Sequence, residues 1–317
     1  MRRVMLALVS IVALAGVAFA APGDLVQNVN LPVTGQGVSV GVDCNGNVFY
    51  TIGDNNFYQM DKDGNLLDTI AVGMDFDEIS WDNGRGVFWA ALHGSNPVDI
   101  YTVNPTTGAA TFQFTSATNS VGSYRDGLAY DAADDSLWVS GDVSSTIEHH
   151  AADGTFLGAI TPKDAAGGTL GTISGVFAGV GNLLYLGRDG AQEIVQVTKS
   201  DGTYIATFAS PGGARDEGLE CDSVNFAPLT VLWSREFNSP GFMSVIELAP
   251  GSCLCGGAPE PTPTGTPGTP TPSPTATALP ATPTPPMPVP ISTPTGLLVL
   301  AGLLAAAGVL LLLRRIV

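Results

Sequence analysis

The stretch Ser80-Trp81-Asp82-Asn83-Gly84-Arg85-Gly86-Val87-Phe88-Trp89 decides the fold of this chain, because it is one copy of a block that recurs five times. Each copy combines a short apolar strand, a tight turn and a second strand rich in aromatic and β-branched residues. The other copies lie at residues 41–50, 129–139, 177–186 and 219–233, and the last two are looser. A period of roughly 40–50 residues with about four strand-like runs per period is typical of a β-propeller.

The first copy shows the four strands of one blade most clearly. The expected strands are residues 38–42, 48–52, 57–60 and 66–70. Turns such as Cys44-Asn45-Gly46-Asn47 join them, and Asn and Gly accept the positive φ that tight hairpins need. We label the strands of a blade A to D from the axis outwards, so that the A–B and C–D turns share one end of the ring.

The fifth copy lacks an outer strand. Its three strands, at residues 218–221, 230–234 and 243–248, are followed by a Pro-rich segment. Residues 24–29 have the pattern of the D strand at 64–69, so we expect the N-terminal strand to complete this blade and remove two unpaired sheet edges. The prediction is an all-β chain folded as a propeller of about five four-stranded blades. The repeat texture resembles that of NHL and related secreted propellers.

The N-terminus has the three parts of a secretory signal peptide. Met1-Arg2-Arg3 is positively charged, residues 6–17 are apolar, and Ala18-Phe19-Ala20 offers small residues at the cleavage positions. We expect residues 1–20 to be removed, so that the mature chain begins at Ala21. The propeller domain then covers residues 21–257.

Two segments without the propeller pattern follow. Residues 258–294 consist mostly of Pro, Thr, Gly, Ser and Ala, a composition with too little apolar surface to fold, so we expect a disordered stalk. At ~3.1 Å per residue, its ~37 residues reach on the order of 110 Å. Residues 295–317 contain an apolar run, 297–313, and a basic pair, Arg314-Arg315. This is the pattern of a membrane helix whose positive end stays in the cytoplasm.

The C-terminal residues resemble bacterial sorting signals of the PEP-CTERM and IPTL-CTERM kind. The matching parts are Val289-Pro290-Ile291-Ser292-Thr293-Pro294, the hydrophobic residues 296–313 and Arg314-Arg315, although the short motif departs from Pro-Glu-Pro. The resemblance implies that a membrane transpeptidase cuts near residues 290–296. Without that cut, the helix is a permanent anchor. Both readings place the propeller outside the cytoplasm, at the cell surface or outer envelope.

The chain is acidic, and its acidity is concentrated in the propeller. The formal net charge is −17, while residues 21–257 hold 28 of the 29 acids and 8 of the 12 basic residues, a balance of −20. Such a surface repels phosphates, which argues against nucleic acid as a partner. Cations, basic partners and neutral glycans fit it, and solubility alone is an equally good explanation.

Four cysteines in an exported chain favour disulfides. Cys44 and Cys221 are expected at the A–B ends of blades one and five, which become neighbours when the ring closes. Cys253 and Cys255 follow the last strand at the same end. We therefore expect disulfides that pin this seam, with their connectivity open. The alternative is a zinc site made of four thiolates, which the Cys-x-Cys spacing disfavours.

At the opposite end of the ring, acidic residues recur at two strand positions near the axis. The residues that close strand B are Asp54, His93, Asp142, Asp189 and Glu236. The acids that open strand A are Asp77, Asp126 and Glu217. One reading is a site for calcium or another cationic ligand, with Asp126 and Glu217 as candidate metal ligands. The other is that each acid caps its own loop and pairs with Arg125, Arg188, Arg215 or Arg235.

Catalytic motifs are scarce. Gly37-Val38-Ser39-Val40-Gly41 matches Gly-x-Ser-x-Gly, but it lies in an expected strand with no helix after it, so it is no nucleophile elbow. His149 and His150 are neighbours on a strand and point to opposite faces, which prevents them from binding one ion together. Asp61-Lys62-Asp63-Gly64 resembles the start of a calcium loop but lacks the later Glu, so we expect an ordinary turn.

Together, these features predict a surface-displayed, non-enzymatic binding or adhesion propeller with an acidic mouth and an extracellular ligand that the sequence does not identify. The alternative is an extracellular metal-dependent hydrolase, lactonase-like, that uses His93 or Glu217 as its base. A third reading is a structural envelope component with no discrete ligand. Because the last strand runs towards the cysteines, the stalk is expected to leave at that end. The acidic mouth would then face away from the membrane.

Overall fold

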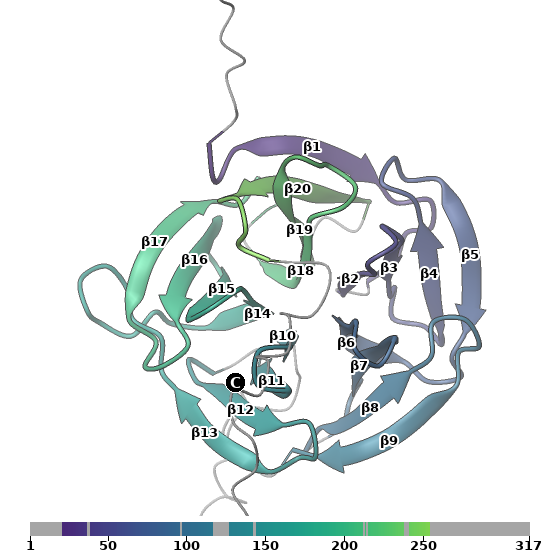
Figure 1. Ribbon diagram of the computed structural model, residues 1–317, viewed down its shortest axis with the longest axis horizontal. Coiled ribbons are helices and arrows are strands. Elements are labelled where there is room, and N and C mark those ends of the chain that lie inside the picture. Colours follow the sequence, from purple (N-terminus) through teal and green to yellow (C-terminus); the bar gives the residue numbers. More distant parts are fainter. Residues whose placement is uncertain are drawn as a thin grey trace, which may run out of the picture. The chain divides into compact units, whose positions relative to one another are not determined.

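The computed structural model describes residues 21–36, 39–95, 97–116, 127–141, 144–211, 213, 215–237 and 241–253. Within them, twenty strands form five four-stranded antiparallel sheets. The sheets are arranged as blades around a common axis, so this part of the chain is a five-bladed β-propeller (Figure 1). The predicted fold and the predicted number of blades are confirmed.

Each of the first four blades is built from four consecutive strands, counted from the axis outwards. Blade 1 contains β2 (Val40–Val42), β3 (Val48–Tyr50), β4 (Asn56–Met60) and β5 (Leu66–Ala71). Blade 2 contains β6 (Phe76–Asp82), β7 (Val87–Leu92), β8 (Asp99–Val103) and β9 (Ala110–Thr115). Blade 3 contains β10 (Gly127–Asp131), β11 (Ser136–Ser140), β12 (Ile147–Ala151) and β13 (Phe156–Ile160). Blade 4 contains β14 (Ile173–Ala178), β15 (Leu183–Arg188), β16 (Glu193–Thr198) and β17 (Tyr204–Ala209).

Blade 5 is completed by the other end of the chain. Its inner strands are β18 (Asp216–Asp222), β19 (Thr230–Glu236) and β20 (Phe242–Leu248), and β1 (Leu25–Asn30) pairs antiparallel with β20 as the outermost strand. Figure 1 shows β1 on the rim of the ring beside β20. The predicted closure by the N-terminal strand is therefore confirmed, and β20 does not remain an unpaired edge.

Small residues let the innermost strands approach one another at the axis. Ser39 Oγ accepts a hydrogen bond from the backbone nitrogen of Ile79 at 2.6 Å, which links blade 1 to blade 2. Ser174 Oγ donates to the backbone oxygen of Asp216 at 2.9 Å, which links blade 4 to blade 5. A Cβ added to Gly127 would lie 2.7 Å from a backbone nitrogen of blade 4, closer than real Cβ contacts. The inner strands converge at the axis, so these positions require small residues such as serine and glycine.

Three blades share a buried contact between strands A and B. The indole Nε1 of Trp89 donates to Asp82 Oδ2 at 3.1 Å. In blades 3 and 5 the same contact joins Trp138 to Asp131 at 3.3 Å and Trp233 to Asp222 at 3.0 Å. These residues belong to the repeated block from which the fold was predicted. The repeat therefore encodes a hydrogen bond within the blade as well as strand periodicity.

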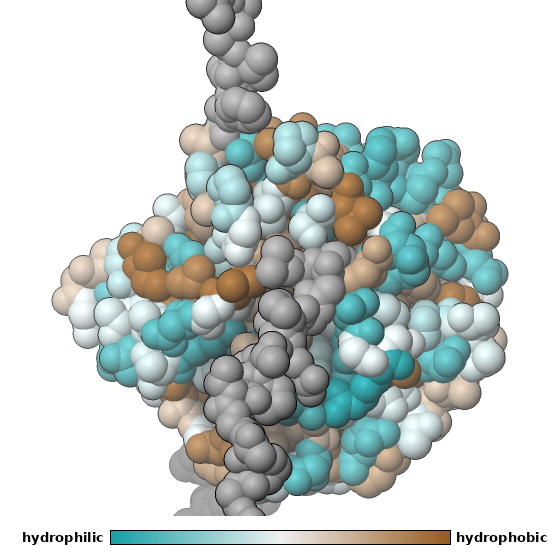
Figure 2. All heavy atoms as spheres, viewed as in Figure 1, coloured by the Kyte–Doolittle hydropathy of each residue, from teal (hydrophilic) through white to brown (hydrophobic). Residues whose placement is uncertain are grey.

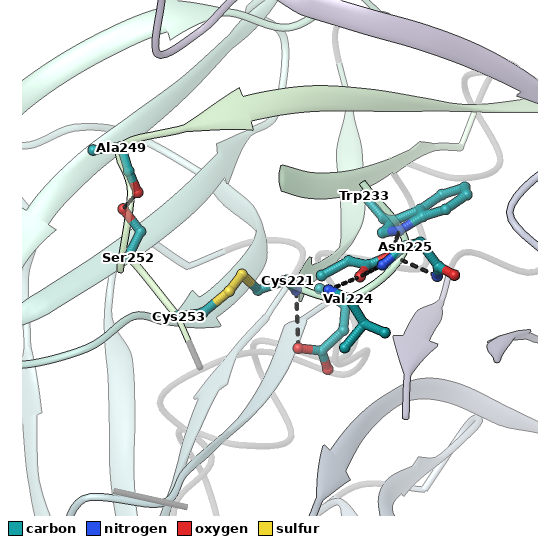
Figure 3. Close-up of a disulfide and its surroundings, with 9 residues drawn as sticks. Cys221, Val224, Asn225, Trp233, Ala249, Ser252 and Cys253 are labelled. Atoms are coloured by element: carbon teal, nitrogen blue, oxygen red, sulfur yellow. Dashed lines mark hydrogen bonds between the residues drawn. A yellow bond between two sulfur atoms is a disulfide. The ribbon is translucent and has the colours of Figure 1, made fainter. Parts of the chain in front are cut away.

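A disulfide joins Cys221, in β18, to Cys253, which follows β20 (Figure 3). Cys44 is disulfide-bonded as well, whereas Cys255 lies outside the described residues. Cys44 and Cys221 lie at the A–B ends of their blades, and the disulfide brings Cys253 to the same end, which we call the cysteine end. A sulfur held in a disulfide cannot serve as a thiolate ligand, so the alternative zinc site is wrong.

The predictions for the termini fall outside the described residues: the signal peptide (1–20), the stalk (258–294) and the C-terminal segment (295–317). In the part of the chain that is described, no helix has the length and apolar character needed to cross a membrane. Figure 2 shows one face of the molecule, on which the coloured apolar residues form small groups separated by hydrophilic ones.

Candidate functional site

The strand register places most of the predicted acidic residues at one end of the ring. In blade 5, Asp216 pairs with Glu236 at one end of the strands, and Asp222 pairs with Val231 at the other, beside Cys221. By the same antiparallel register, the end opposite the cysteines carries Asp54, Asp77, His93, Asp189, Glu217 and Glu236. We call it the mouth end. Asp126 and Asp142 lie outside the described residues.

Three carboxylates and an imidazole gather on the mouth end of blades 1 and 2. Asp54 follows β3, Asp75 precedes β6, Asp77 lies in β6 and His93 follows β7. His93 Nδ1 lies 2.5 Å from Asp77 Oδ1, and the backbone nitrogen of His93 donates to the backbone oxygen of Asp75 at 2.9 Å. We call Asp54, Asp75, Asp77 and His93 the blade 1–2 cluster. The sequence prediction missed Asp75, because it considered only residues that close strand B or open strand A.

Burial and like charge both act on this cluster. Burial raises the pKa of Asp77, while the hydrogen bond and the charge of His93 lower it in part. Burial also raises the pKa of Asp75, His93 opposes the shift, and the charge of Asp54 adds to it. Asp75 Oδ1 is buried and has no hydrogen-bond partner among the described residues. A buried acceptor without a partner is unfavourable, so a donor that reaches it gains free energy.

Asp54 is held in a fixed position by its own loop. Its carboxylate accepts hydrogen bonds from the backbone nitrogen and the side-chain amide of Asn56 at 2.9 and 3.0 Å. It also accepts one from the Tyr58 hydroxyl at 2.7 Å. Burial and this contact raise the pKa of Tyr58 to about 12, so its hydroxyl stays protonated. Asp54 therefore caps its loop, with its carboxylate near Asp75.

Glu217, the other predicted metal ligand, is buried beneath an arginine. Its carboxylate forms an ion pair with Arg215, whose guanidinium lies 4.6 Å from the centre of the Phe237 ring. Only 1% of the Glu217 side chain is exposed, against 25% of Arg215. The expected pairing of an acid with a neighbouring arginine therefore occurs at Glu217.

Among the described residues, Arg235 forms no ion pair with a neighbouring acid, in contrast to the second reading. It is fully buried, and its guanidinium donates to backbone oxygens of blade 1: Ser39 at 3.2 Å, Gly35 at 3.4 Å, and Thr51. Burial lowers its pKa to about 10, which leaves it charged at neutral pH. Arg235 thus ties blade 5 to blade 1 at the mouth end of the seam.

Glu236 and Asp189, the remaining predicted residues that the structure describes, do not face one open mouth. Glu236 is buried, and a Cβ added to Gly213 would lie 2.5 Å from its carboxyl carbon, so residue 213 covers it. Asp189 is partly exposed, but its neighbour Arg188 forms an ion pair with Glu193 instead. Glu217 and Glu236 of blade 5 are therefore covered, whereas the acids of the blade 1–2 cluster lie within range of one another's charge.

A preformed metal site is not found in the described part of the chain. No three of its His, Cys, Asp or Glu side chains are arranged to hold a metal ion. The predicted ligand pair cannot be assembled from these residues, because Asp126 is not among them.

Many of the other acids stabilise turns. The Asp61 carboxylate accepts hydrogen bonds from the backbone nitrogens of Asp63 and Asn65 at 3.0 and 2.9 Å, so this segment is an ordinary turn, as predicted. Carboxylates accept backbone hydrogen bonds in the same way at Asp43, Asp131, Asp153, Asp164, Asp201 and Asp222. Much of the acidic composition is thus explained by turn structure.

The two neighbouring histidines lie apart from the mouth end. His150 is buried and its Nε2 lies 2.9 Å from Glu148 Oε2. The His149 ring stacks on Trp138 with centres 3.9 Å apart and contacts Ser136 Oγ at 2.7 Å. Each histidine has its own partner, which agrees with the expectation that the two do not bind one ion together.

Comparison with solved structures finds other propellers. The glutaminyl cyclase of Myxococcus xanthus superposes with a TM-score of 0.54 at 12% identity, covering 71% of this chain and 95% of that one. The calcium-binding protein regucalcin of Agrobacterium tumefaciens gives a TM-score of 0.49 at 12% identity, with 73% and 97% covered. At these identities the likeness extends to the fold alone. No protein-family model matches the sequence, and no curated protein matches it either.

Proposed function

We propose that the protein is an exported binding module, displayed at the cell surface, whose blade 1–2 cluster binds a cationic group of its ligand. The observation that carries this proposal is the gathering of Asp54, Asp75 and Asp77 beside His93, where Asp75 Oδ1 has no hydrogen-bond partner among the described residues. An ammonium or guanidinium group satisfies both the charge and the acceptor. The ligand class is therefore a basic peptide or protein segment.

The charge of the whole propeller supports this ligand class. An acidic surface attracts cationic ligands over long range and raises their association rate. Calcium remains the alternative cation, and it would need residues beyond the described ones, such as Asp126, to complete its ligands. Calcium needs several oxygen ligands at once, whereas an ammonium or guanidinium group can bind to one or two carboxylates. Titrations with calcium and with a basic peptide therefore distinguish the two kinds of cation.

The position of Cys253, the last described residue, bears on how a displayed propeller would present its cluster. Cys253 lies at the cysteine end, while Asp54 and Asp77 lie at the mouth end. If the predicted stalk and C-terminal helix hold the protein to the envelope, the blade 1–2 cluster faces the surroundings. That orientation suits a receptor or adhesion module on a stalk.

Titration of the mature chain with short oligolysine and oligoarginine peptides tests the proposal. In the double variant Asp75→Asn/Asp77→Asn, we expect the affinity to fall about tenfold or more, because charge-assisted contacts contribute on the order of 1–3 kcal/mol each. The matched control is Asp153→Asn/Asp201→Asn, which removes the same charge from exposed turns at the cysteine end. Equal losses in both variants would show that the peptides bind by net charge alone and would refute the site.

A second function is favoured by one specific contact. Asp77 contacts His93, and 49% of the His93 side chain is exposed. A solvent-accessible histidine held by an aspartate is an arrangement used in general-base catalysis. If the protein is a hydrolase, it should turn over members of a panel of esters and lactones, with or without added calcium. Because the fold resembles that of a glutaminyl cyclase, the panel includes a peptide with an amino-terminal glutamine. Turnover that is lost in His93→Gln supports the enzyme, and absence of turnover leaves the binding module.

A further inference from the structure

A tight turn precedes the strand that closes the ring. The sequence Ala21-Pro22-Gly23-Asp24 forms it, with the backbone nitrogen of Asp24 donating to the backbone oxygen of Ala21 at 2.9 Å. Gly23 adopts a φ of 97°, and proline followed by such a glycine is the sequence of a type II turn. The Asp24 side chain folds back, and its Oδ2 accepts a hydrogen bond from the backbone nitrogen of Ala21 at 2.8 Å.

This turn is attached to the ring on both sides. The backbone nitrogen of Gly23 donates to the backbone oxygen of Glu247 at 2.8 Å, and the nitrogen of Glu247 donates to the oxygen of Asp24 at 2.9 Å. A Cβ added to Gly23 would lie 2.6 Å from Phe208 Cβ, so the turn packs closely against blade 4. The turn therefore fixes the first residues of β1, whose pairing with β20 closes the ring.

The same nitrogen is the one that the predicted cleavage would release. Residues 18–20 have the small-x-small pattern recognised by signal peptidases, so the scissile bond joins Ala20 to Ala21. Before hydrolysis the Ala21 nitrogen is a neutral amide with one proton. Hydrolysis adds water across the bond, leaving a carboxylate on Ala20 and an ammonium group on Ala21.

We propose that cleavage between Ala20 and Ala21 strengthens the closure of the ring, because the new ammonium group of Ala21 forms an ion pair with Asp24 that steadies β1. This inference rests on the proposed export of the protein, but not on any ligand of the blade 1–2 cluster. The pair is exposed, so its contribution is modest. The expected effect is about a two- to fivefold slower local opening of β1, the range that exposed ion pairs produce.

The first measurement locates the cleavage. The full-length chain is expressed in a host that exports it, and the mature N-terminus is read by mass spectrometry. The proposal predicts Ala21 as the first residue. A mature chain that begins at any other residue overturns the proposal, and it does so without bearing on ligand binding.

The second measurement tests the ion pair. Hydrogen exchange in residues 25–30 is compared between the mature chain and a chain with a Gly-Ser extension before Ala21, each with and without Asp24→Asn. The extension should speed exchange about two- to fivefold in the native sequence and have no effect in Asp24→Asn. Asp68→Asn, an exposed carboxylate on the outer strand β5, is the matched control and should leave the effect of the extension unchanged.

Two results would overturn the ion pair even if cleavage occurs at Ala21. One is equal exchange in the mature and extended chains. The other is an extension effect of the same size with and without Asp24→Asn, which would show that the extension acts sterically. Chemical acetylation of the mature N-terminus removes the charge without adding residues, and it should reproduce the effect of the extension.

Discussion

Glu220 Oε2 in blade 5 lies 3.3 Å from the backbone nitrogen of Trp81 in blade 2, although these blades are not neighbours in the ring. The carboxylate also accepts hydrogen bonds from Ser80 Oγ at 3.4 Å and from the backbone nitrogen of Cys221 at 3.0 Å. It therefore crosses the axis near the cysteine end. Burial raises the pKa of Glu220 from 4.5 to about 8, so much of it is protonated at neutral pH.

Replacement of Glu220 should change how stability depends on pH. Because the folded pKa lies above the unfolded value, the folded state binds this proton more tightly. The stabilisation is complete below about pH 4.5 and is lost as the pH rises to about 8. Glu220→Gln keeps the neutral shape, so we expect it to match the native chain at low pH and to exceed it by a few kcal/mol at most above pH 8. Urea unfolding across this range measures the difference; parallel profiles for the two proteins would refute it.

Asp135 is kept in an unfavourable conformation by a contact between blades. Its φ is 55°, whereas the corresponding residue of blade 2 is Gly86 with a φ of 66°. Its carboxylate oxygens accept hydrogen bonds from Arg85 of blade 2 at 2.7 and 2.8 Å. Asp135→Gly loses the exposed ion pair but relieves the backbone, so we expect a change within about 0.5 kcal/mol. Asp135→Ala loses the ion pair without that relief, and its unfolding free energy should fall by about 1–2 kcal/mol. Equal unfolding free energies for the two variants would contradict the backbone strain inferred at residue 135.

The Trp–Asp contact of blade 5 should respond unequally to loss of its two partners. Asp222 and Trp233 are both fully buried, and the Asp222 carboxylate also accepts hydrogen bonds from Asn225 Nδ2 and from two backbone nitrogens. Asp222→Ala leaves several donors without an acceptor and should cost about 2–4 kcal/mol. Trp233→Phe leaves the carboxylate with its other donors and should cost about 1–2 kcal/mol. Thermal unfolding of both variants checks the order, and the reverse order would show that packing, rather than hydrogen bonding, dominates this contact.

The disulfide between Cys221 and Cys253 should stabilise the seam of the ring. It closes a loop of 32 residues that includes β19 and β20, so its removal should cost about 2–4 kcal/mol. In Cys221→Ser/Cys253→Ser we also expect faster hydrogen exchange in residues 24–30, because β1 depends on β20. Hydrogen exchange in blade 3 serves as the internal control, because blade 3 is adjacent to neither blade 1 nor blade 5. Unchanged exchange at β1 together with faster exchange in blade 3 would contradict this account.

The sequence was sufficient to predict the ring and its closure. Strand periodicity and the repeated Asp and Trp positions define the blades, and the Pro-rich segment after β20 leaves residues 24–29 as the remaining outer strand. These signals are local, and tertiary packing did not override them. The cysteine end was likewise predictable, because strand direction alone places Cys44, Cys221 and Cys253 together.

The site was only partly predictable, because its details depend on contacts between distant segments. Register placed Asp54, Asp77 and His93 at one end, yet nothing local shows that residue 213 covers Glu236. Arg235 reaches carbonyl oxygens about 200 residues away, a contact that exists only after the ring closes. Asp75 lies in the connection between blades 1 and 2. Asp75 and Asp77 are two residues apart, so in an extended chain both point to the side opposite Phe76, and this was the one sequence signal that could have identified Asp75.

Carboxyl footprinting of the mature chain shows whether a cationic group binds at the blade 1–2 cluster. Asp54, Asp75 and Asp77 are labelled with a carbodiimide and an amine in the presence and absence of an oligolysine peptide, and the modified residues are quantified by mass spectrometry. We expect the peptide to slow labelling of these three carboxylates and to leave labelling of the exposed turns at Asp153 and Asp201 unchanged. Equal protection of all five residues, or protection of Asp153 and Asp201 alone, would contradict it.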